Sequence, residues 1–324
     1  MTPPITMAKA LNNGLRKAME TDPKVLIMGE DVGKLGGVFR ITDGLQKDFG
    51  EDRVIDTPLA ESGIIGTAVG LAIRGYRPVC EIQFDGFVFP GFDQIVSQVA
   101  KMHNRSAGQL RMPITIRIPF GGGIGAVEHH SESPEAYFAH TAGLRVLACS
   151  NPSDAYWMIQ NAIADDDPVI FFEPKRLYHG AKGEIEDEPY PLYNARVVRP
   201  GRDVTLIAYG PTVATALKSA AIAAEDGVEL EVIDLRSVSP LDMPTIVESV
   251  QRTGRLIVVH EAPHSFSVSS EIATRVMEQA FYSLEAPVLR VTGYDTPYPP
   301  SRLEHEWLPN VDRVLDTVDT IMEY

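Results

Sequence analysis

Short apolar runs alternate with segments of helical periodicity along almost the whole chain, and this order restricts the fold more than any other feature. Parallel strands joined by helical crossovers form a sheet with helices on both faces. In the first half the predicted strands are 25–28, 79–82, 114–118, 146–149 and 169–172, and the predicted helices are 7–18, 64–73, 92–106 and 155–164. We therefore predict an α/β first domain built on a parallel sheet.

The second half repeats the alternation after an irregular stretch. Residues 174–203 are rich in Gly, Pro, Tyr and charge without periodicity, which is typical of a linker. Beyond it the predicted strands are 204–208, 230–233, 256–259 and 288–291, and the predicted helices are 212–224, 241–250, 268–281 and 311–322. Two domains suit a chain of 324 residues. We predict a first domain over residues 1–180, a linker over 181–203 and a smaller α/β domain over 204–324.

Charge and apolar content exclude several classes of protein. A net charge of −15 repels phosphate backbones and disfavours nucleic-acid binding. No apolar run approaches the roughly 20 residues of a membrane-spanning helix. Cys80 and Cys149 each lie within an apolar run, which favours buried, reduced thiols. We expect a soluble intracellular protein, either in the bacterial cytoplasm or in the mitochondrial matrix after loss of a presequence.

The first candidate for a functional residue is Glu61, which opens a glycine-dotted helix directly after Pro58 ends a strand. Ligands of parallel α/β sheets bind at the carboxyl ends of the strands, so the position favours function. The alternative is structural, because acidic residues in the first turn of a helix complement its dipole.

A second signal is an aromatic-rich run after the next strand, with Phe84, Phe87, Phe89 and Phe92 close to Gln83. Such rings either stack on a flat heteroaromatic cofactor or simply form core. The run alone does not decide between the two.

The third signal is a glycine-rich run, 119–131, which delivers His129 and His130. Glycines let a backbone approach a ligand closely, and an imidazole there can bind a carboxylate or shuttle protons. The alternative is a surface loop with incidental histidines. Gly121, Gly123 and Ala126 also fit a dinucleotide-binding pattern, but no apolar helix follows directly, so we discount that interpretation.

One zinc-protease pattern, His260-Glu261-Ala262-Pro263-His264, is misleading. That chemistry needs both histidines on one helix face, whereas this stretch follows a predicted strand and contains a proline. We expect a strand-to-loop junction.

Taken together in this order and spacing, the three signals resemble the beta subunits of two-chain 2-oxo acid dehydrogenases, most closely the branched-chain (3-methyl-2-oxobutanoate) type. The similarity covers nearly the whole chain, in segments 28–32, 56–61, 82–94, 130–140, 171–175, 258–262 and 298–303. It implies a transketolase-like pyrimidine-binding domain, a parallel sheet with helices on both faces, followed by a smaller α/β transketolase C-terminal domain.

The resemblance also implies roles for particular residues. Glu61 would hydrogen-bond N1′ of the aminopyrimidine of thiamine diphosphate and so assist removal of the thiazolium C2 proton. Phe87 would stack on the pyrimidine where the branched-chain family often has Tyr, and Gln83 would line the same pocket. His130 would face the substrate carboxylate or the lipoyl sulfur. Here Glu132 replaces the usual Gln and His129 is additional, so the charge around His130 departs from the family pattern.

The same alignment implies metal sites and a missing half. The family's Gly-Asp-Gly motif, which holds the cofactor diphosphate through Mg²⁺, does not occur in this chain. An alpha subunit would therefore hold Mg²⁺ and complete an alpha-two beta-two heterotetramer. A structural site for a monovalent cation, K⁺, would be formed by Met112, Ile114, Thr115, Ala162, Asp165 and Asp167.

The function expected from this resemblance is oxidative decarboxylation of a branched-chain 2-oxo acid and acyl transfer to lipoyl on a dihydrolipoyl acyltransferase. The alternatives are the pyruvate enzyme of the same architecture, a non-catalytic scaffold subunit that bridges the alpha chain to the complex core, and a nicotinamide-dependent dehydrogenase that uses the loop at Gly121.

Overall fold

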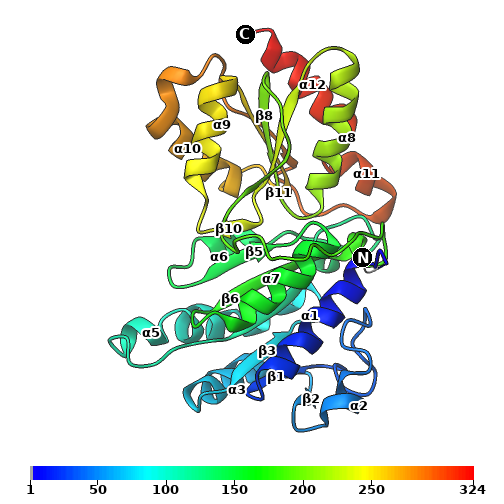
Figure 1. Cartoon of the computed structure of the whole chain (residues 1–324), viewed down its shortest axis with the longest axis vertical. Coiled ribbons are helices and arrows are strands. Elements are labelled where there is room, and N and C mark those ends of the chain that lie inside the picture. Colours follow the sequence, from blue (N-terminus) through cyan, green and yellow to red (C-terminus); the bar gives the residue numbers. More distant parts are fainter. Residues whose placement is uncertain (1–2) are drawn as a thin grey trace.

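The computed structural model describes residues 3–324 as two α/β halves stacked along the long axis (Figure 1). The strands are β1 (Val25–Gly29), β2 (Val54–Asp56), β3 (Arg77–Glu81), β4 (Thr115–Phe120), β5 (Arg145–Ala148), β6 (Val169–Pro174), β7 (Arg196–Arg199), β8 (Val204–Ala208), β9 (Leu230–Asp234), β10 (Ser237–Ser239), β11 (Leu256–Pro263) and β12 (Leu289–Gly293). The α-helices are α1 (Met7–Thr21), α2 (Leu45–Phe49), α3 (Glu61–Ile73), α4 (Phe92–Gln94), α5 (Met102–Arg105), α6 (Glu135–Ala139), α7 (Pro152–Ala164), α8 (Thr212–Glu225), α9 (Met243–Thr253), α10 (Val268–Ala280), α11 (Glu304–Trp307) and α12 (Val311–Met322).

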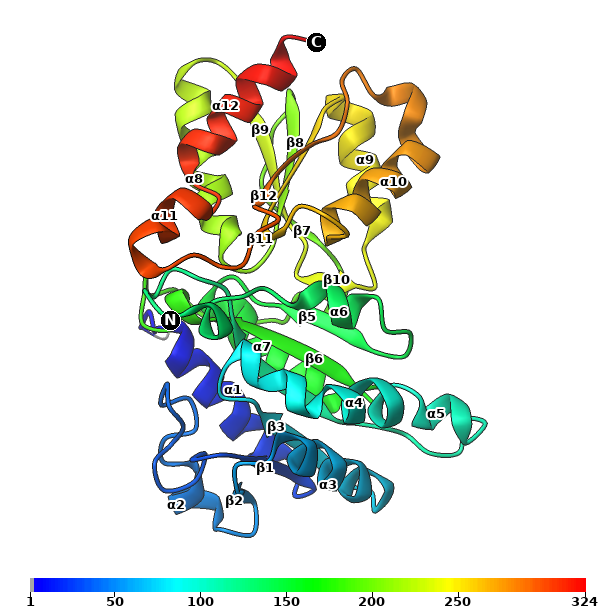
Figure 2. The same cartoon turned by 180° about the vertical axis from the view of Figure 1, so that it is seen from behind.

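The first sheet has the strand order β10-β5-β6-β4-β3-β1-β2, and all its pairs except β10 with β5 are parallel. Alternate residues point to opposite faces. Ile27 and Phe171 pack under α1 and α7, whereas Met28 and Phe172 lie in the core that α3 covers. Figure 1 shows α1 and α7 on the near face, and Figure 2 shows α3 and α4 on the far face.

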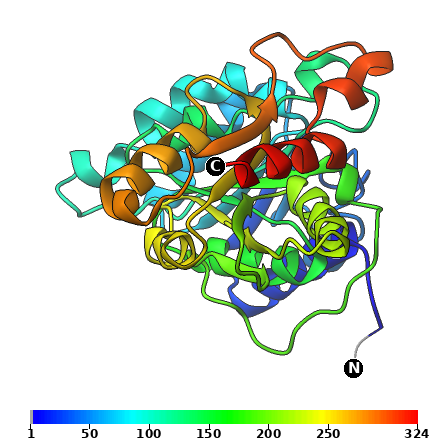
Figure 3. The same ribbon diagram turned by 90° about the horizontal axis from the view of Figure 1, so that it is seen from above.

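The second sheet has the order β12-β11-β8-β9-β7 and is smaller. Helices α8 and α12 cover one face, where Val213 and Val318 pack on Leu206. Helices α9 and α10 cover the other face, with Ile246 and Val276 in the core (Figure 3). The alternation of strands and helices predicted from the sequence is therefore confirmed in both halves.

Side chains cap the starts of two of these helices. Thr6 caps α1 by accepting a hydrogen bond from the Lys9 amide at 3.3 Å. Asn151 caps α7 by accepting one from the Asp154 amide at 2.9 Å. Each side chain satisfies a backbone donor that has no partner within its helix.

Two local predictions were wrong and one strand was missed. The single helix expected over 92–106 is broken into α4, a π-helical turn η2 (Ile95–Val99) and α5. At this break Gly143 approaches so closely that a Cβ on it would lie 2.0 Å from the Ala100 oxygen. Strand β10 was not predicted at all. The predicted linker contains β7, which pairs antiparallel with β9 and belongs to the second sheet.

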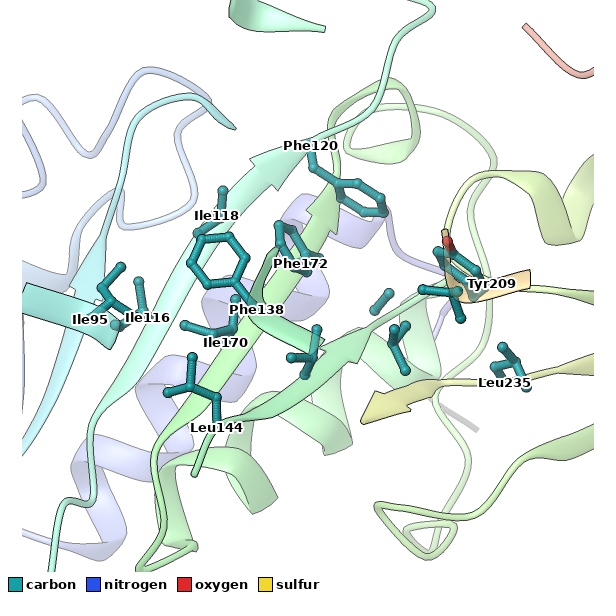
Figure 4. Close-up of a cluster of buried hydrophobic side chains, with 14 of the residues drawn as sticks. Ile95, Ile116, Ile118, Phe120, Phe138, Leu144, Ile170, Phe172, Tyr209 and Leu235 are labelled. Atoms are coloured by element: carbon teal, nitrogen blue, oxygen red, sulfur yellow. The ribbon is translucent and has the colours of Figure 1, made fainter. Parts of the chain in front are cut away.

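The two halves share one hydrophobic core. Phe120, Phe138 and Phe172 of the first half continue into Tyr209 and Leu235 of the second (Figure 4). Strand β10 adds to this junction, because it follows β9 in sequence yet pairs with β5 of the first sheet. No helix within residues 3–324 is long and apolar enough to cross a membrane.

Candidate active site

Glu61 is the first residue of α3, beyond the carboxyl end of β2, and only 7% of it is exposed. The dipole of α3 favours a carboxylate at this end, so the structural explanation for an acidic residue also holds here. That explanation does not account for burial, since removing a carboxylate from water costs several kcal/mol, more than the roughly 2 kcal/mol at most that a helix dipole contributes.

Glu30 is a second buried carboxylate next to Glu61 and follows β1 directly. Burial raises the pKa of Glu30, and the nearby charges of Glu61 and Asp31 raise it further. Its Oε1 atom has no hydrogen-bond partner among residues 3–324. Within residues 3–324 the pair is therefore buried without a balancing cation. The sequence analysis did not single out Glu30, although it lies in the segment 28–32 that carries the family resemblance.

Gln83 lies beside this acidic pair. Its side-chain amide donates to Asp31 Oδ2 at 3.2 Å and to the Glu30 carbonyl at 3.4 Å. These contacts connect the end of β3 with the end of β1.

Phe87 lies on the 3₁₀ turn η1 (Asp85–Gly91), which packs against the start of α3. A Cβ on Gly91 would lie 3.2 Å from the Glu61 carbonyl oxygen, so the two backbones are in close contact. The structure thus brings Glu61, Gln83 and Phe87 to one edge of the first sheet.

His130 completes the cluster. Its ring stacks on Phe84 with centroids 4.0 Å apart and meets the edge of Phe87 at 5.0 Å. Its Nδ1 atom is buried and has no hydrogen-bond partner among the described residues. His129 is exposed, and the centroid of its ring lies 6.1 Å from that of Phe87. Phe84, which the sequence left undistinguished among the aromatics, is therefore the ring that fixes the plane of His130.

A buried ion pair lies next to the cluster of Phe84, Phe87 and His130. Lys175 donates to Asp85, both side chains are fully buried, and Asp85 Oδ2 accepts the Glu132 amide at 2.8 Å. Burial raises the pKa of Asp85 and lowers that of Lys175, and each charge opposes the shift of the other. Burial, with the charges of Asp85 and Glu128, also raises the pKa of Glu132.

A second buried network lies at the ends of β3, β4 and β6. Arg117 donates to Glu81 at 2.5 Å and to both oxygens of Glu173 at 2.6 and 2.8 Å. Tyr178 donates to Glu173 at 2.6 Å. One guanidinium thus balances two buried carboxylates, which gives this network a structural character.

The six residues of the expected cation site lie around the start of β4 and the end of α7. Their charged groups already have partners, since Arg145 is 2.7 Å from Asp167 and 3.6 Å from Asp165, and Tyr193 donates to Asp165. These pairs engage side chains, whereas the expected K⁺ site would be formed largely by backbone carbonyls, so the site stays a prediction. Within residues 3–324 no cluster of three His, Cys, Asp or Glu residues has metal-binding geometry.

The two discounted motifs are structural. His260 is fully buried on β11, bonded to Ser267 at 3.1 Å and Ser269 at 2.8 Å, and burial lowers its pKa to about 3. In the glycine-rich loop, the amide of Gly122 donates to Glu261 at 2.9 Å and that of Gly123 to Glu304 at 2.8 Å. Donors that a dinucleotide phosphate would need are thus taken by carboxylates.

The site residues fit the pyrimidine end of thiamine diphosphate. Unpartnered atoms of Glu30 and His130 and the carboxylate of Glu61 provide polar contacts, and Phe87 offers a flat apolar surface beside them. A cavity of about 1420 Å³ lies elsewhere, between the halves, lined by residues such as Tyr137, Leu241 and Phe266. The side chains of Glu61, Gln83, Phe87 and His130 do not line this cavity.

Both the fold and this site define a transketolase-like protein. Residues 3–180 match the family model "Transketolase, pyrimidine binding domain" and residues 193–314 match "Transketolase, C-terminal domain". A solved structure, "Split gene transketolase, inactive beta4 tetramer", superposes with a TM-score of 0.83 over 99% of both chains at 20% identity. That level of identity supports the fold alone.

Relatives with higher identity define the family more narrowly. The chain is 63% identical to "Pyruvate dehydrogenase E1 component subunit beta" of Leifsonia xyli, over 99% of this chain and 95% of the relative. It is 55% identical to "3-methyl-2-oxobutanoate dehydrogenase subunit beta" of Mycobacterium tuberculosis, over 99% and 93%. It is 48% identical to the Bacillus subtilis pyruvate dehydrogenase E1 beta subunit, over 99% of each chain. The chain therefore belongs to the beta subunits of 2-oxo acid dehydrogenase E1 components, a family whose membership implies thiamine diphosphate.

Proposed function

We propose that this chain contributes the pyrimidine half of a thiamine diphosphate site, in which Glu61 is the acid-base residue. The observation that carries the proposal is the buried pair of Glu61 and Glu30, for which the described part of the chain provides no balancing cation. A carboxylate held in that position suits a hydrogen bond to a protonated ring nitrogen. The cofactor supplies the electron sink for decarboxylation, and this chain's residues bind its ring and move protons.

An alpha subunit is the proposed partner that completes the site. The described residues offer no cluster for the Mg²⁺ that the diphosphate requires. Apolar side chains beside the site are exposed, including Leu59 at 80% and Phe89 at 42%. Exposed apolar surface next to an incomplete site favours a protein partner over solvent. The proposed assembly is an alpha-two beta-two heterotetramer that acylates lipoyl on a dihydrolipoyl acyltransferase.

The proposed substrate is a branched-chain 2-oxo acid. The segment from His130 to His140, which resembles the branched-chain type, and the 55% identity to the Mycobacterium tuberculosis subunit support it. Pyruvate is the second candidate, supported by the 63% identity to the Leifsonia xyli subunit. Rates of acceptor reduction on the reconstituted complex distinguish them. We expect 3-methyl-2-oxobutanoate to be the better substrate, and a tenfold preference for pyruvate would contradict this choice.

The catalytic role is tested by Glu61→Gln in the reconstituted complex with thiamine diphosphate and Mg²⁺. Loss of the acid-base group is expected to lower turnover by about 10² to 10⁴, with the heterotetramer still assembled. The exposed Glu20 of α1 provides the control, since Glu20→Gln removes the same charge far from the site elements. Unchanged turnover in Glu61→Gln would favour a scaffold subunit without chemistry of its own.

A further inference from the structure

Residues 121–132 form a loop whose two ends are hydrogen-bonded to each other, and this loop carries His129 and His130. The Gly121 amide donates to the Glu132 carbonyl at 2.9 Å and closes the loop at its base. The Glu132 amide in turn donates to the buried Asp85 at 2.8 Å. Compact loops of this kind are frequently functional, and their conformation depends on what holds the arms.

Two carboxylates of the C-terminal half hold the glycine-rich arm of this loop. Glu261 Oε2 accepts the Gly122 amide at 2.9 Å. Glu304 accepts the Gly123 amide on one oxygen at 2.8 Å and the Gly125 amide on the other at 3.1 Å. Hydrogen bonds from amides to an ionised carboxylate are stronger than bonds between neutral groups. Glu304 lies on α11, which Figure 1 shows at the level where the two halves meet.

Both carboxylates are themselves fixed. Tyr298 donates to Glu304 Oε1 at 2.6 Å, and Arg176 forms an ion pair with Glu261. At Gly122 the packing leaves no room for a side chain, since a Cβ there would lie 1.9 Å from the Tyr298 hydroxyl. This glycine is thus required by the close approach of the C-terminal segment.

The ring of His130 has no hydrogen bond of its own to define its position within the described residues. Its Nδ1 lacks a partner, and the ring is located by stacking on Phe84 and by the backbone, where the His130 amide donates to the Val127 carbonyl at 3.0 Å. A shift of the arm at Gly123 and Gly125 is therefore transmitted along a short segment to the imidazole.

We propose that Glu304, supported by Tyr298, is a positioning residue that holds His130 in place for the reaction from the C-terminal half of the chain. The inference rests on the proposed function, because Glu304 acts only through His130, a residue of the proposed site. It assigns Glu304 no contact with substrate or cofactor. It gives the C-terminal half a part in the site beyond packing.

The test uses the reconstituted heterotetramer with thiamine diphosphate and Mg²⁺ and follows reductive acylation of a lipoyl domain. A displacement of about 1 Å at a reacting group lowers the rate on the order of 10²-fold. Because Phe84 still holds the ring, we expect Glu304→Ala to lower the rate of reductive acylation by a smaller factor, roughly tenfold. Glu304→Gln keeps one acceptor oxygen and should lose less. Glu306 on the same helix is the matched control, since it is exposed and pairs only with His305 at 3.1 Å, so Glu306→Ala should retain the wild-type rate.

A double variant separates positioning from general structural damage. In a His130→Ala background, Glu304→Ala is expected to cause no further loss, because the group through which it acts is already absent. A further tenfold loss in that background would overturn the inference. Hydrogen exchange of peptides covering 121–132 gives a readout independent of activity, and the amides of Gly123 and Gly125 should exchange faster in Glu304→Ala.

The remaining outcomes distinguish this inference from the proposed function. If Glu61→Gln and His130→Ala are impaired but Glu304→Ala matches Glu306→Ala, the inference is wrong and the function stands. If Glu61→Gln and His130→Ala are both fully active, the function fails and takes the inference with it. Should Glu304→Ala not fold, Tyr298→Phe removes one bond to Glu304 and should show a smaller loss in the same step. A wild-type rate in a folded Tyr298→Phe would then count against the inference.

Discussion

Two groups of buried carboxylates lie at the carboxyl ends of strands in the first sheet, and they differ in what faces them. Glu81 and Glu173 share the guanidinium of Arg117. Glu30 and Glu61 face each other, and burial and like charge raise the pKa of Glu30. The first group is balanced within the chain and stabilises it. The second keeps uncompensated charge, which suits a site completed by something outside the chain.

The largest expected effect concerns the balanced group. Arg117→Met should lower the free energy of unfolding by about 3–5 kcal/mol, because two carboxylates remain buried without a cation. Urea unfolding of the purified chain measures it. Arg196 is the control, since it makes a similar two-bond pair with Glu186, at 2.6 and 3.0 Å, on the surface. Arg196→Met should cost only about 0–1 kcal/mol, and equal losses would contradict the distinction.

Another buried carboxylate, Glu135, lies outside both groups and makes stability depend on pH. Burial raises its pKa to about 7, and its bond from Tyr209 at 2.5 Å opposes the shift only in part. Between the ordinary glutamate pKa and 7 the folded chain holds a proton that the unfolded chain has lost, so this residue's stability contribution falls as pH rises. Glu135→Gln should remove roughly 2–4 kcal/mol of that fall, seen as a flatter dependence of Tm on pH between 4.5 and 7.5.

The smallest effect concerns the unbalanced pair itself. Because the pKa of Glu30 is raised in the folded chain, its ionisation costs stability at neutral pH. Glu30→Gln should therefore increase the free energy of unfolding at pH 7, by less than about 1 kcal/mol after solvent screening. The gain should vanish near pH 4, where the group is protonated. A loss of stability at pH 7 would show that the pair is not repulsive, and Glu20→Gln supplies the exposed comparison.

The regular part of the fold followed from local signals. Apolar runs and helical spacing predict strands such as β4 and helices such as α7, because each element buries a face that its own residues define. Strand β10 has only three residues, and its pairing partner β5 lies in the other half of the chain. No local pattern encodes such a pairing, and the same limit applies to the π-helical turn beside Gly143.

The candidate site was predicted in the same uneven way. Glu61, Gln83, Phe87 and His130 stand out by their position after strands, and the structure brings them together. The partners of these residues depend on contacts between distant segments. Glu30 approaches Glu61 only because β1 and β2 are neighbours, and Glu304 reaches the glycine-rich loop from about 180 residues away. Sequence reasoning therefore singled out candidate residues that lie together in the structure and missed the contacts that hold them.

The pairing of β10 with β5 has a consequence for how the chain can be divided. A fragment ending after β6 would retain every catalytic candidate yet leave β5 with a row of unsatisfied amides and carbonyls along one side. Exposed edge strands of this kind pair with other chains and promote aggregation. The first half of the chain therefore depends on the second to cover this edge, so the two halves are expected to remain soluble only as one polypeptide.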